Sequence, residues 1–216
     1  MIPLRDTIPS SRPPIVTYAL IAANVLAFLY TVSLGPAAEA FIYAHGLIPR
    51  DFTFAALLTS MSLHGGWLHL LGNMLYLYIF GDNVEDRLGH LRYLVFYLLC
   101  GIAAGTAQAI TNPGSTLPMV GASGAIAGVL GAYLIFFPTA RVVTLVPVFF
   151  FLQIVEIPAV VLLVIWFGWQ LLSGVATLGQ QAGMGGVAFF AHVGGFLAGM
   201  ILGPVMQRPA AVSRWE

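Results

Sequence analysis

The sequence predicts an all-α membrane protein, a bundle of six membrane-spanning helices with its N- and C-termini in the cytoplasm. Of the 216 residues, 59% are hydrophobic and only 7% are charged, and the mean hydropathy of +0.93 is far above that of a soluble domain. Four long intervals contain no Asp, Glu, Lys or Arg: residues 13–38, 52–81, 93–140 and 157–207. We therefore expect a lipid bilayer around the chain and a single membrane domain over residues 1–216.

The charge-free intervals place the spans. A spanning helix needs about 20 residues, so the first two intervals hold one span each and the last two hold two each. The third interval is broken by Asn112-Pro113-Gly114 and the fourth by a glycine-rich stretch at 178–186. The six predicted spans are about 15–34, 64–81, 92–111, 120–137, 158–178 and 187–206. The first is interpreted as a span and not as a signal peptide, because its apolar core exceeds the usual length of about 7–15 residues.

The arginines set the orientation and exclude one class of partner. With the N-terminus in the cytoplasm, every arginine except Arg50 falls on the cytoplasmic side, as the positive-inside rule requires. The basic residues are scattered along the chain and the formal net charge is zero, so we expect no nucleic-acid partner. Nothing in the sequence indicates an oligomeric state.

Two connections between the predicted spans are unusual. The outer loop at 35–63 is too long for a simple turn and mixes aromatic residues with Pro and Gly, so we expect part of it to lie in the membrane interface. The segment at 142–155 is apolar but only about 14 residues long, which is too short to span. It is interpreted as an interfacial or re-entrant piece.

Polar side chains gather at one depth of the predicted bundle. Spans two, four and six all run inward from the outer face. Their outer ends carry His64, His69 and Asn73, then Ser123, then His192. Such groups are costly inside a membrane and usually face the bundle interior. Taken singly, each histidine can equally be a hydrogen-bonded packing residue, and Ser123 between glycines can simply allow close helix packing. Their shared depth favours a functional site.

Small residues on two spans would bring the serine and a histidine together. One face of span six carries a histidine followed by glycines, and one face of span four carries the serine followed by small residues. These are His192, Gly195, Gly199 and Gly203, and Ser123, Ala127 and Gly131. Helices with such faces can pack backbone to backbone. That approach allows the distance of about 2.6–3.2 Å that a nucleophile and its base need.

The residue types fit an acyl-transfer site with Ser123 as nucleophile and His192 as general base. The outer halves of the predicted spans contain no Asp or Glu, so the sequence predicts a Ser-His dyad and not a triad. His69 and Asn73 are four residues apart on one helix face, and both can donate hydrogen bonds to a developing oxyanion. Such a donor is typically worth about 2.7–4 kcal/mol in the transition state. No metal and no cofactor is expected.

Three motifs resemble those of the rhomboid family of intramembrane serine proteases: residues 64–73 (HGGWLHLLGN), 121–124 (GASG) and 191–199 (AHVGGFLAG). Their order, spacing and span assignment all agree with the family. The resemblance implies that Ser123 is the nucleophile and His192 the general base. It implies an oxyanion hole of His69, Asn73 and the backbone N–H of Ser123.

The resemblance also implies an activity and a location. The chain would be a serine endopeptidase that cleaves single-span transmembrane proteins near the outer membrane face. We expect an integral multi-pass protein of a bacterial inner (plasma) membrane. The loop at about 179–187 resembles the flexible cap over the family's site. In the cytoplasmic loop at 83–89, Glu85 and Arg87 are expected to act in structure.

The chain departs from the family pattern at three points. Many rhomboids carry an aromatic residue four positions after the nucleophile, packed under the base, and here that residue is Ala127. Some bacterial members carry a histidine where this chain has Ser60, and the Trp-Arg pair often found in the first outer loop is missing. None of these changes removes a reacting group, but Ala127 leaves the support of the His192 ring to another residue.

Two alternatives come from other functional classes. A non-proteolytic protein of the same fold would bind membrane segments without cutting them, although retention of all four site residues argues against this. A metal or ion site could use His64, His69 and His192. The outer half of the bundle offers no carboxylate or thiolate to complete such a site, and no His-Glu-x-x-His motif is present.

Overall fold

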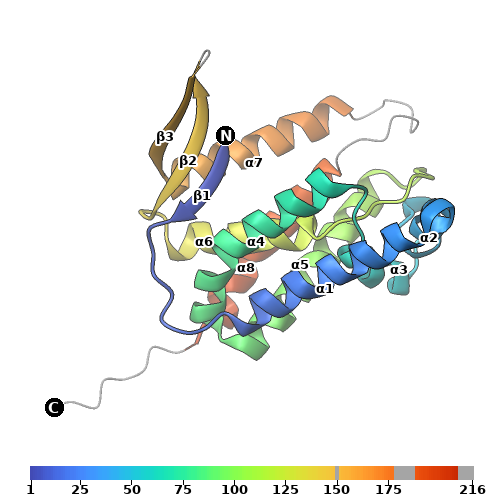
Figure 1. Cartoon of the computed structure of the whole chain (residues 1–216), viewed down its shortest axis with the longest axis horizontal. Helices are drawn as coiled ribbons and strands as arrows, with labels where there is room; N and C mark the ends of the chain where they lie inside the picture. Colours follow the sequence, from blue (N-terminus) through green and yellow to red (C-terminus); the bar gives the residue numbers. More distant parts are fainter. Residues whose placement is uncertain (149–150, 178–187, 209–216) are drawn as a thin grey trace.

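The computed structural model describes residues 1–148, 151–177 and 188–208, and it has long helices close to all six predicted spans. They are α1 (Ile15–Ser33), α4 (Trp67–Leu88), α5 (His90–Thr111), α6 (Ser123–Phe136), α7 (Ala159–Thr177) and α8 (Phe189–Met206). Two short helices, α2 (Ala38–His45) and α3 (Phe54–Thr59), lie in the connection between α1 and α4. Figure 1 shows these elements packed into one helical bundle with α7 along one side.

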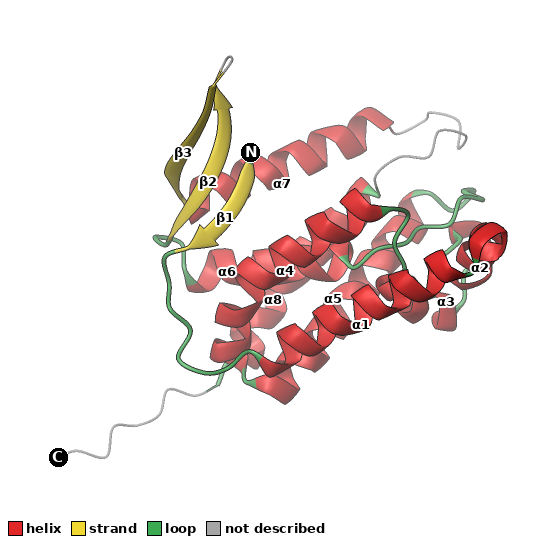
Figure 2. Ribbon diagram, viewed as in Figure 1, coloured by secondary structure: helices red, strands yellow, loops and turns green. Residues whose placement is uncertain are grey.

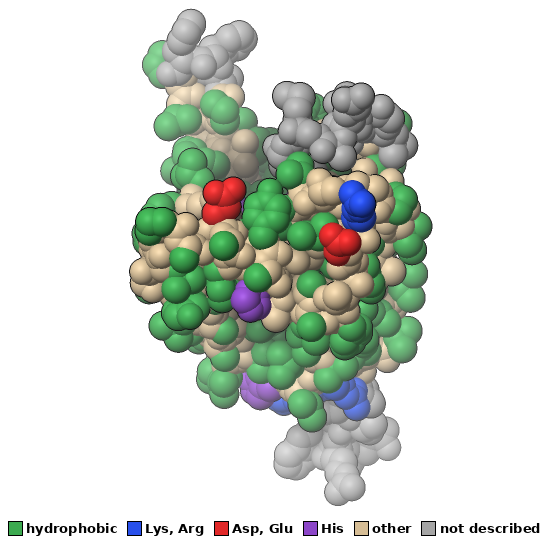
Figure 3. Space-filling model, turned by 90° about the vertical axis from the view of Figure 1, so that its right-hand side faces the viewer, with side chains coloured by type: hydrophobic (Ala, Val, Ile, Leu, Met, Phe, Trp, Pro, Cys, Tyr) green, Lys and Arg blue, Asp and Glu red, His purple; other side chains and the backbone are tan. Residues whose placement is uncertain are grey.

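The composition of the helices identifies a multi-pass membrane protein. Among the described residues, α1, α5, α7 and α8 are long and apolar enough to cross a bilayer, and α6 is a shorter apolar helix of 14 residues. Figure 3 shows one face of the molecule, on which hydrophobic side chains dominate and charged ones are few. The structure thus has four candidate spans and a shorter apolar helix. The six-span topology stays a prediction.

The expectation of an all-α fold is wrong, because three strands form an antiparallel sheet at one end of the bundle (Figure 2). Strand β1 (Ile2–Asp6) pairs with β2 (Arg141–Val148), which pairs with β3 (Phe151–Pro158). The segment interpreted as an interfacial or re-entrant piece is therefore most of a β-hairpin. Its Val, Ile, Thr and Phe residues are those that fit a pleated strand. An apolar run of this length does not distinguish helix from strand by periodicity alone.

A half-buried carboxyl group ties the sheet to the helices. Asp6, the last residue of β1, accepts hydrogen bonds at Oδ2 from the Tyr133 hydroxyl of α6 (2.6 Å) and the Asn83 amide of α4 (2.8 Å). The pKa of Asp6 is raised to about 6, mainly by burial and in smaller part by the nearby Asp82 carboxylate, against the opposing effect of the Tyr133 hydrogen bond. At neutral pH the ionised Asp6 is partly desolvated, and this lowers the stability of the folded protein.

Replacing Asp6 by asparagine is expected to change the pH dependence of stability. Because the folded-state pKa lies above the ordinary value of 3.8, the folded protein binds more protons than the unfolded chain between these two values. The stabilisation from the neutral carboxyl is therefore complete below about pH 4 and is lost as the pH rises through about 6. The asparagine side chain keeps an acceptor oxygen and carries no charge, so Asp6→Asn should unfold about 2–4 °C higher than the wild type above pH 7.

The measurement is thermal unfolding in detergent from pH 5 to pH 8. The gap between Asp6→Asn and the wild type should narrow as the pH falls towards 5. Asp51→Asn, at an exposed carboxyl group, serves as the matched control and should follow the wild type at every pH. A difference in unfolding temperature that does not vary with pH would contradict the raised pKa of Asp6.

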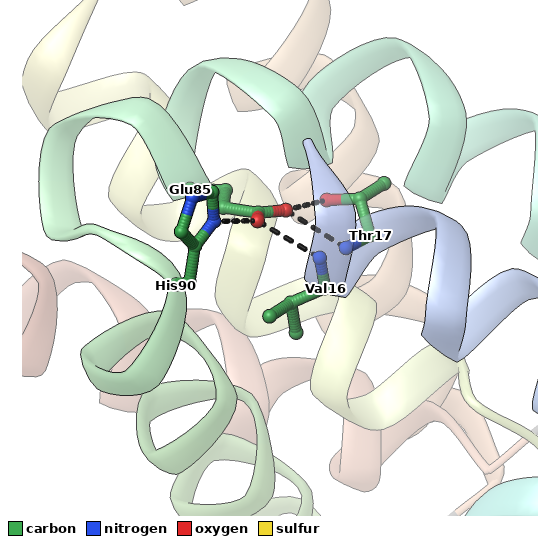
Figure 4. A network of polar contacts seen from close by, with 4 residues as sticks. All are labelled: Val16, Thr17, Glu85 and His90. Carbon is green, nitrogen blue, oxygen red and sulfur yellow. Dashed lines mark hydrogen bonds and ion pairs between the residues drawn. The ribbon is translucent and has the colours of Figure 1, made fainter. Parts of the chain in front are cut away.

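A fully buried carboxylate joins α4 to the start of α1 (Figure 4). Glu85 accepts hydrogen bonds from the backbone N–H groups of Val16 (2.9 Å) and Thr17 (2.8 Å), from the Thr17 hydroxyl (2.7 Å), and from His90 Nδ1. The first N–H groups of a helix have no partner within the helix, and Glu85 satisfies two of them. Helix α4 continues to Leu88, beyond the predicted end of span two, and Glu85 lies on this extension. The neighbouring Arg87 lies 5.0 Å over the ring of Phe137.

Helix α6 is the centre of the bundle, because all of its residues from Gly124 to Tyr133 are buried. It meets α8 at glycines on both helices. A Cβ atom on Gly195 would lie 2.0 Å from the carbonyl oxygen of Gly124, and one on Gly199 would lie 1.8 Å from that of Gly128. The two backbones are thus in direct contact, as the small-residue faces predict. This contact fixes the distance between residues at the start of α6 and the start of α8.

Candidate active site

Ser123 is the first residue of α6, directly after a tight turn. Gly121 in this turn has φ of +126°, a conformation that side chains disfavour. Its N–H donates to the backbone carbonyl of Ser60 (2.9 Å), which fixes the turn against the short helix before α4. The first N–H groups of α6, including that of Ser123, are the positive end of the helix dipole. The site therefore offers a hydroxyl group beside backbone donors.

His192 lies on the first turn of α8 and faces Ser123. Its Nε2 atom is 2.8 Å from Ser123 Oγ, within the range of a nucleophile and its base. The imidazole is buried, with 8% of its surface exposed. The contact between Gly124 and Gly195, just beyond these two residues, explains why so short a side chain as serine can reach the ring. The structure brings together the two residues that the sequence suggested as nucleophile and base.

His69 and Asn73 of α4 approach the same turn from the other side. A Cβ atom on Gly121 would lie 2.7 Å from His69 Nε2 and 3.5 Å from Asn73 Nδ2, so both side chains lie against this glycine. Asn73 Nδ2 is also 2.9 Å from His64 Nε2, and the His64 and His69 rings pack edge to face with centroids 5.1 Å apart. His64 therefore supports Asn73 from behind the turn.

These residues line one cavity of about 640 Å³. Its polar wall contains Ser123, His192, His69 and Asn73, and apolar side chains such as Met61 and Ile126 make up most of the remainder. A cavity that is mostly apolar with a few converging polar groups is typical of a binding or active site. Here the converging groups are a hydroxyl, a base and hydrogen-bond donors, which is the set that acyl transfer requires.

Two residues of α7 complete the surroundings of His192, and the sequence reasoning missed both. Gln170 Oε1 lies 2.8 Å from His192 Nδ1. The indole of Trp166 lies with its ring centroid 5.8 Å from the imidazole centroid, tilted by 38°. The available signal was the side-chain amide of Gln170 in an otherwise apolar span, since such amides usually find a partner on another helix. Trp166, four residues earlier, shares its helix face.

The departures from the family pattern have local explanations. Ala127 is fully buried and provides no ring under the base, whereas Trp166 of α7 contacts the imidazole from another direction. Ser60 is buried and uses its backbone carbonyl to hold Gly121. The expected cap at 179–187 lies outside the residues that the structure describes.

The histidines do not form a metal centre in the described part of the chain. No three His, Cys, Asp or Glu side chains come together there in a ligating arrangement. Both ring nitrogens of His192 already have partners, Nδ1 with Gln170 and Nε2 with Ser123. A metal bound to His192 would have to displace one of these partners.

Comparisons with known proteins agree with this geometry. A family model described as Rhomboid domain matches residues 51–209, a range that includes every side chain of the site. The chain is 32% identical to Rhomboid protease GluP of Bacillus subtilis (strain 168), over 88% of this chain and 35% of that protein. It is 32% identical to Rhomboid-like protease 5 of Toxoplasma gondii, over 72% and 16%. It is also 32% identical to RHOMBOID-like protein 6, mitochondrial, of Arabidopsis thaliana, over 74% and 46%. The chain spans less than half the length of each of these relatives. The chain belongs to the rhomboid family.

Proposed function

We propose that the chain is an intramembrane serine endopeptidase that hydrolyses peptide bonds of single-span transmembrane proteins near the outer membrane face. The observation that carries this proposal is the 2.8 Å separation of Ser123 Oγ and His192 Nε2 inside an apolar bundle. Membership of the rhomboid family and the names of two relatives, which are called proteases, support it. No cofactor takes part in the proposed reaction.

The proposed reaction has two half-reactions. Ser123 Oγ attacks the carbonyl carbon of the scissile peptide bond while His192 Nε2 accepts the hydroxyl proton. The protonated His192 then gives that proton to the leaving amine, and the C–N bond breaks. Water, activated by the same nitrogen, hydrolyses the acyl-enzyme and restores the serine. In each half-reaction, His192 accepts one proton and then donates it.

The developing oxyanion would be stabilised by His69, Asn73 and the first N–H of α6. Removing one such donor usually lowers kcat by about 10²–10³-fold. Asn73→Ala is therefore expected to lower kcat by that factor in a reconstituted cleavage assay. Leu71→Ala, at an exposed position on the same helix, is the matched control. Full kcat in Asn73→Ala, with an unfolding temperature like that of the wild type, would exclude Asn73 from the oxyanion hole.

A serine-directed probe tests the proposed activity. Purified protein in lipid vesicles should react with a fluorophosphonate, peptide mapping should find the adduct on Ser123, and cleavage of a single-span substrate should stop as the adduct forms. A protein that only binds membrane segments would not be labelled there. Activity that continues in the presence of a chelator would exclude the metal-site alternative. Absence of both labelling and cleavage would overturn the proposal.

The finer topology is part of the same proposal. We propose six spans with both termini in the cytoplasm, as the distribution of the arginines favours. The proposed location is the inner (plasma) membrane of a bacterium, which the relative from Bacillus subtilis supports. With this orientation, Ser123 and His192 would lie near the outer ends of α6 and α8.

A further inference from the structure

We propose that Gln170 is a positioning residue that makes the site a Ser-His-Gln arrangement, and that α7 thereby sets the orientation of the base. This inference rests on the proposed protease function. The sequence predicts a dyad because no carboxylate lies near the serine. The geometry points to a neutral amide in the place that a carboxylate takes in a triad.

The hydrogen bond from His192 to Gln170 selects one form of the imidazole ring. A neutral imidazole carries a single N–H, and an amide oxygen can only accept a hydrogen bond. Gln170 Oε1, 2.8 Å from Nδ1, therefore keeps the proton on Nδ1. Nε2 is left with its lone pair directed at Ser123 Oγ, also at 2.8 Å. This is the tautomer that can accept the serine proton.

Burial makes this contact costly to lose. Gln170 and His192 are each only 8% exposed. The neighbouring α7 residues Trp169 and Leu172 are 68% and 70% exposed, so the helix turns an apolar face outward and Gln170 inward. A buried polar group without a partner carries its full desolvation penalty. Helix α7 is thus held in the rotation that directs Gln170 at His192.

The same helix also places an aromatic ring beside the imidazole. Trp166 contacts the imidazole from α7, and it packs against Phe196 of α8 as well, with ring centroids 6.0 Å apart. Ala127 of α6 carries no ring that could do so. Apart from Ser123, the described side chains that orient the imidazole are Gln170 and Trp166, and both belong to α7. His192 is held in the productive orientation only while α7 lies against α8.

Two substitutions at Gln170 separate the role of the acceptor from that of the side-chain volume. Gln170→Met has a similar length and no acceptor. Gln170→Glu keeps an acceptor oxygen and adds a charge that favours the protonated ring. Leu172→Met, on the exposed face of α7, is the matched control. All are compared with the wild type in lipid vesicles by kcat, KM and pH profile for a single-span substrate.

We expect Gln170→Met to lower kcat by about 10- to 100-fold, with KM changed less than about twofold, because the proposed role of Gln170 is to orient the base for the chemical step. Gln170→Glu should restore most of kcat at neutral pH and move the acid limb of the kcat profile to higher pH. Equal kcat in Gln170→Met and the wild type would overturn the proposal, as would equal losses in Gln170→Met and Gln170→Glu. If Gln170→Met does not fold, the pH profile of Gln170→Glu decides: a shifted acid limb supports the role and an unchanged one overturns it.

A spectroscopic measurement keeps this inference separate from the proposed function. Nitrogen-15 NMR of histidine-labelled protein reports which ring nitrogen carries the proton, and His192→Ala identifies the signal. We expect His192 to be protonated at Nδ1 in the wild type and to become a tautomer mixture in Gln170→Met. If His192 is protonated at Nδ1 but the protein cleaves no substrate, the protease function is refuted and the hydrogen bond to Gln170 is still supported. If the protein cleaves its substrate but Gln170→Met does not alter the His192 signal, the protease function is supported and the role of Gln170 is refuted.

Discussion

Substitution of Ser123 by alanine is expected to abolish cleavage, with a fall in kcat on the order of 10⁴-fold or more. The change removes the only side-chain oxygen that lies 2.8 Å from His192 Nε2 among the described residues. Alanine fits the first position of α6 without disturbing the turn or the glycine contacts with α8. The variant should therefore fold and bind substrate, and lose the chemical step alone.

The measurement is single-turnover cleavage of a single-span substrate in lipid vesicles, together with fluorophosphonate labelling. Ser33→Ala removes an exposed hydroxyl at the end of α1 and should cleave like the wild type. Undiminished cleavage by Ser123→Ala would refute the assignment of the nucleophile. A loss of cleavage in both variants would indicate damage to the assay and not to the site.

The second large effect is expected on folding, from Gly199→Leu. A Cβ atom at this position would lie 1.8 Å from the carbonyl oxygen of Gly128. That neighbour is helix backbone and cannot turn aside as a flexible side chain can, so α6 and α8 must move apart. The cost should exceed the roughly 1–3 kcal/mol of ordinary overpacking. Separation of the helices would also pull His192 away from Ser123, and cleavage should be lost with stability.

Gly168→Leu is the matched control, because a Cβ atom at Gly168 would have no described heavy atom beyond its own helix backbone and chain neighbours within 4 Å. Both variants are compared with the wild type by yield, thermal unfolding in detergent and cleavage rate. Gly168→Leu should behave like the wild type, and Gly199→Ala should fall between the two leucine variants in stability. A Gly199→Leu variant with wild-type stability would show that the two backbones are not in contact.

Much of the helical arrangement could be predicted because a membrane restricts the choices. The charge-free intervals and the breakers at 112–114 and 178–186 locate all six long helices to within a few residues, except that α4 continues past its predicted end. The glycines at 195 and 199 predicted a close approach of α8 to α6, and the structure has that contact. The shared depth of the polar residues and the small-residue faces were therefore enough to predict that Ser123 and His192 lie close together.

The remaining features depend on contacts between distant segments, which local patterns do not encode. Strand β1 pairs with β2 across more than 130 residues, and an apolar run such as that of β2 and β3 has no period that separates strand from helix. Gln170 is one amide in an apolar helix, and its partner depends on how α7 is rotated against α8. The first feature corrected the predicted fold class, and the second gives the proposed base a hydrogen-bond partner that the sequence reasoning missed.

The link between Glu85 and the start of α1 has a consequence for the order of assembly. Helix α1 begins after Pro14 and, within the described structure, has no capping side chain of its own. The carboxylate that bonds to its first amides is 68 residues away from Thr17 along the chain. A ribosome synthesises α1 long before Glu85. Helix α1 can therefore form these contacts at its start only after α4 has been made.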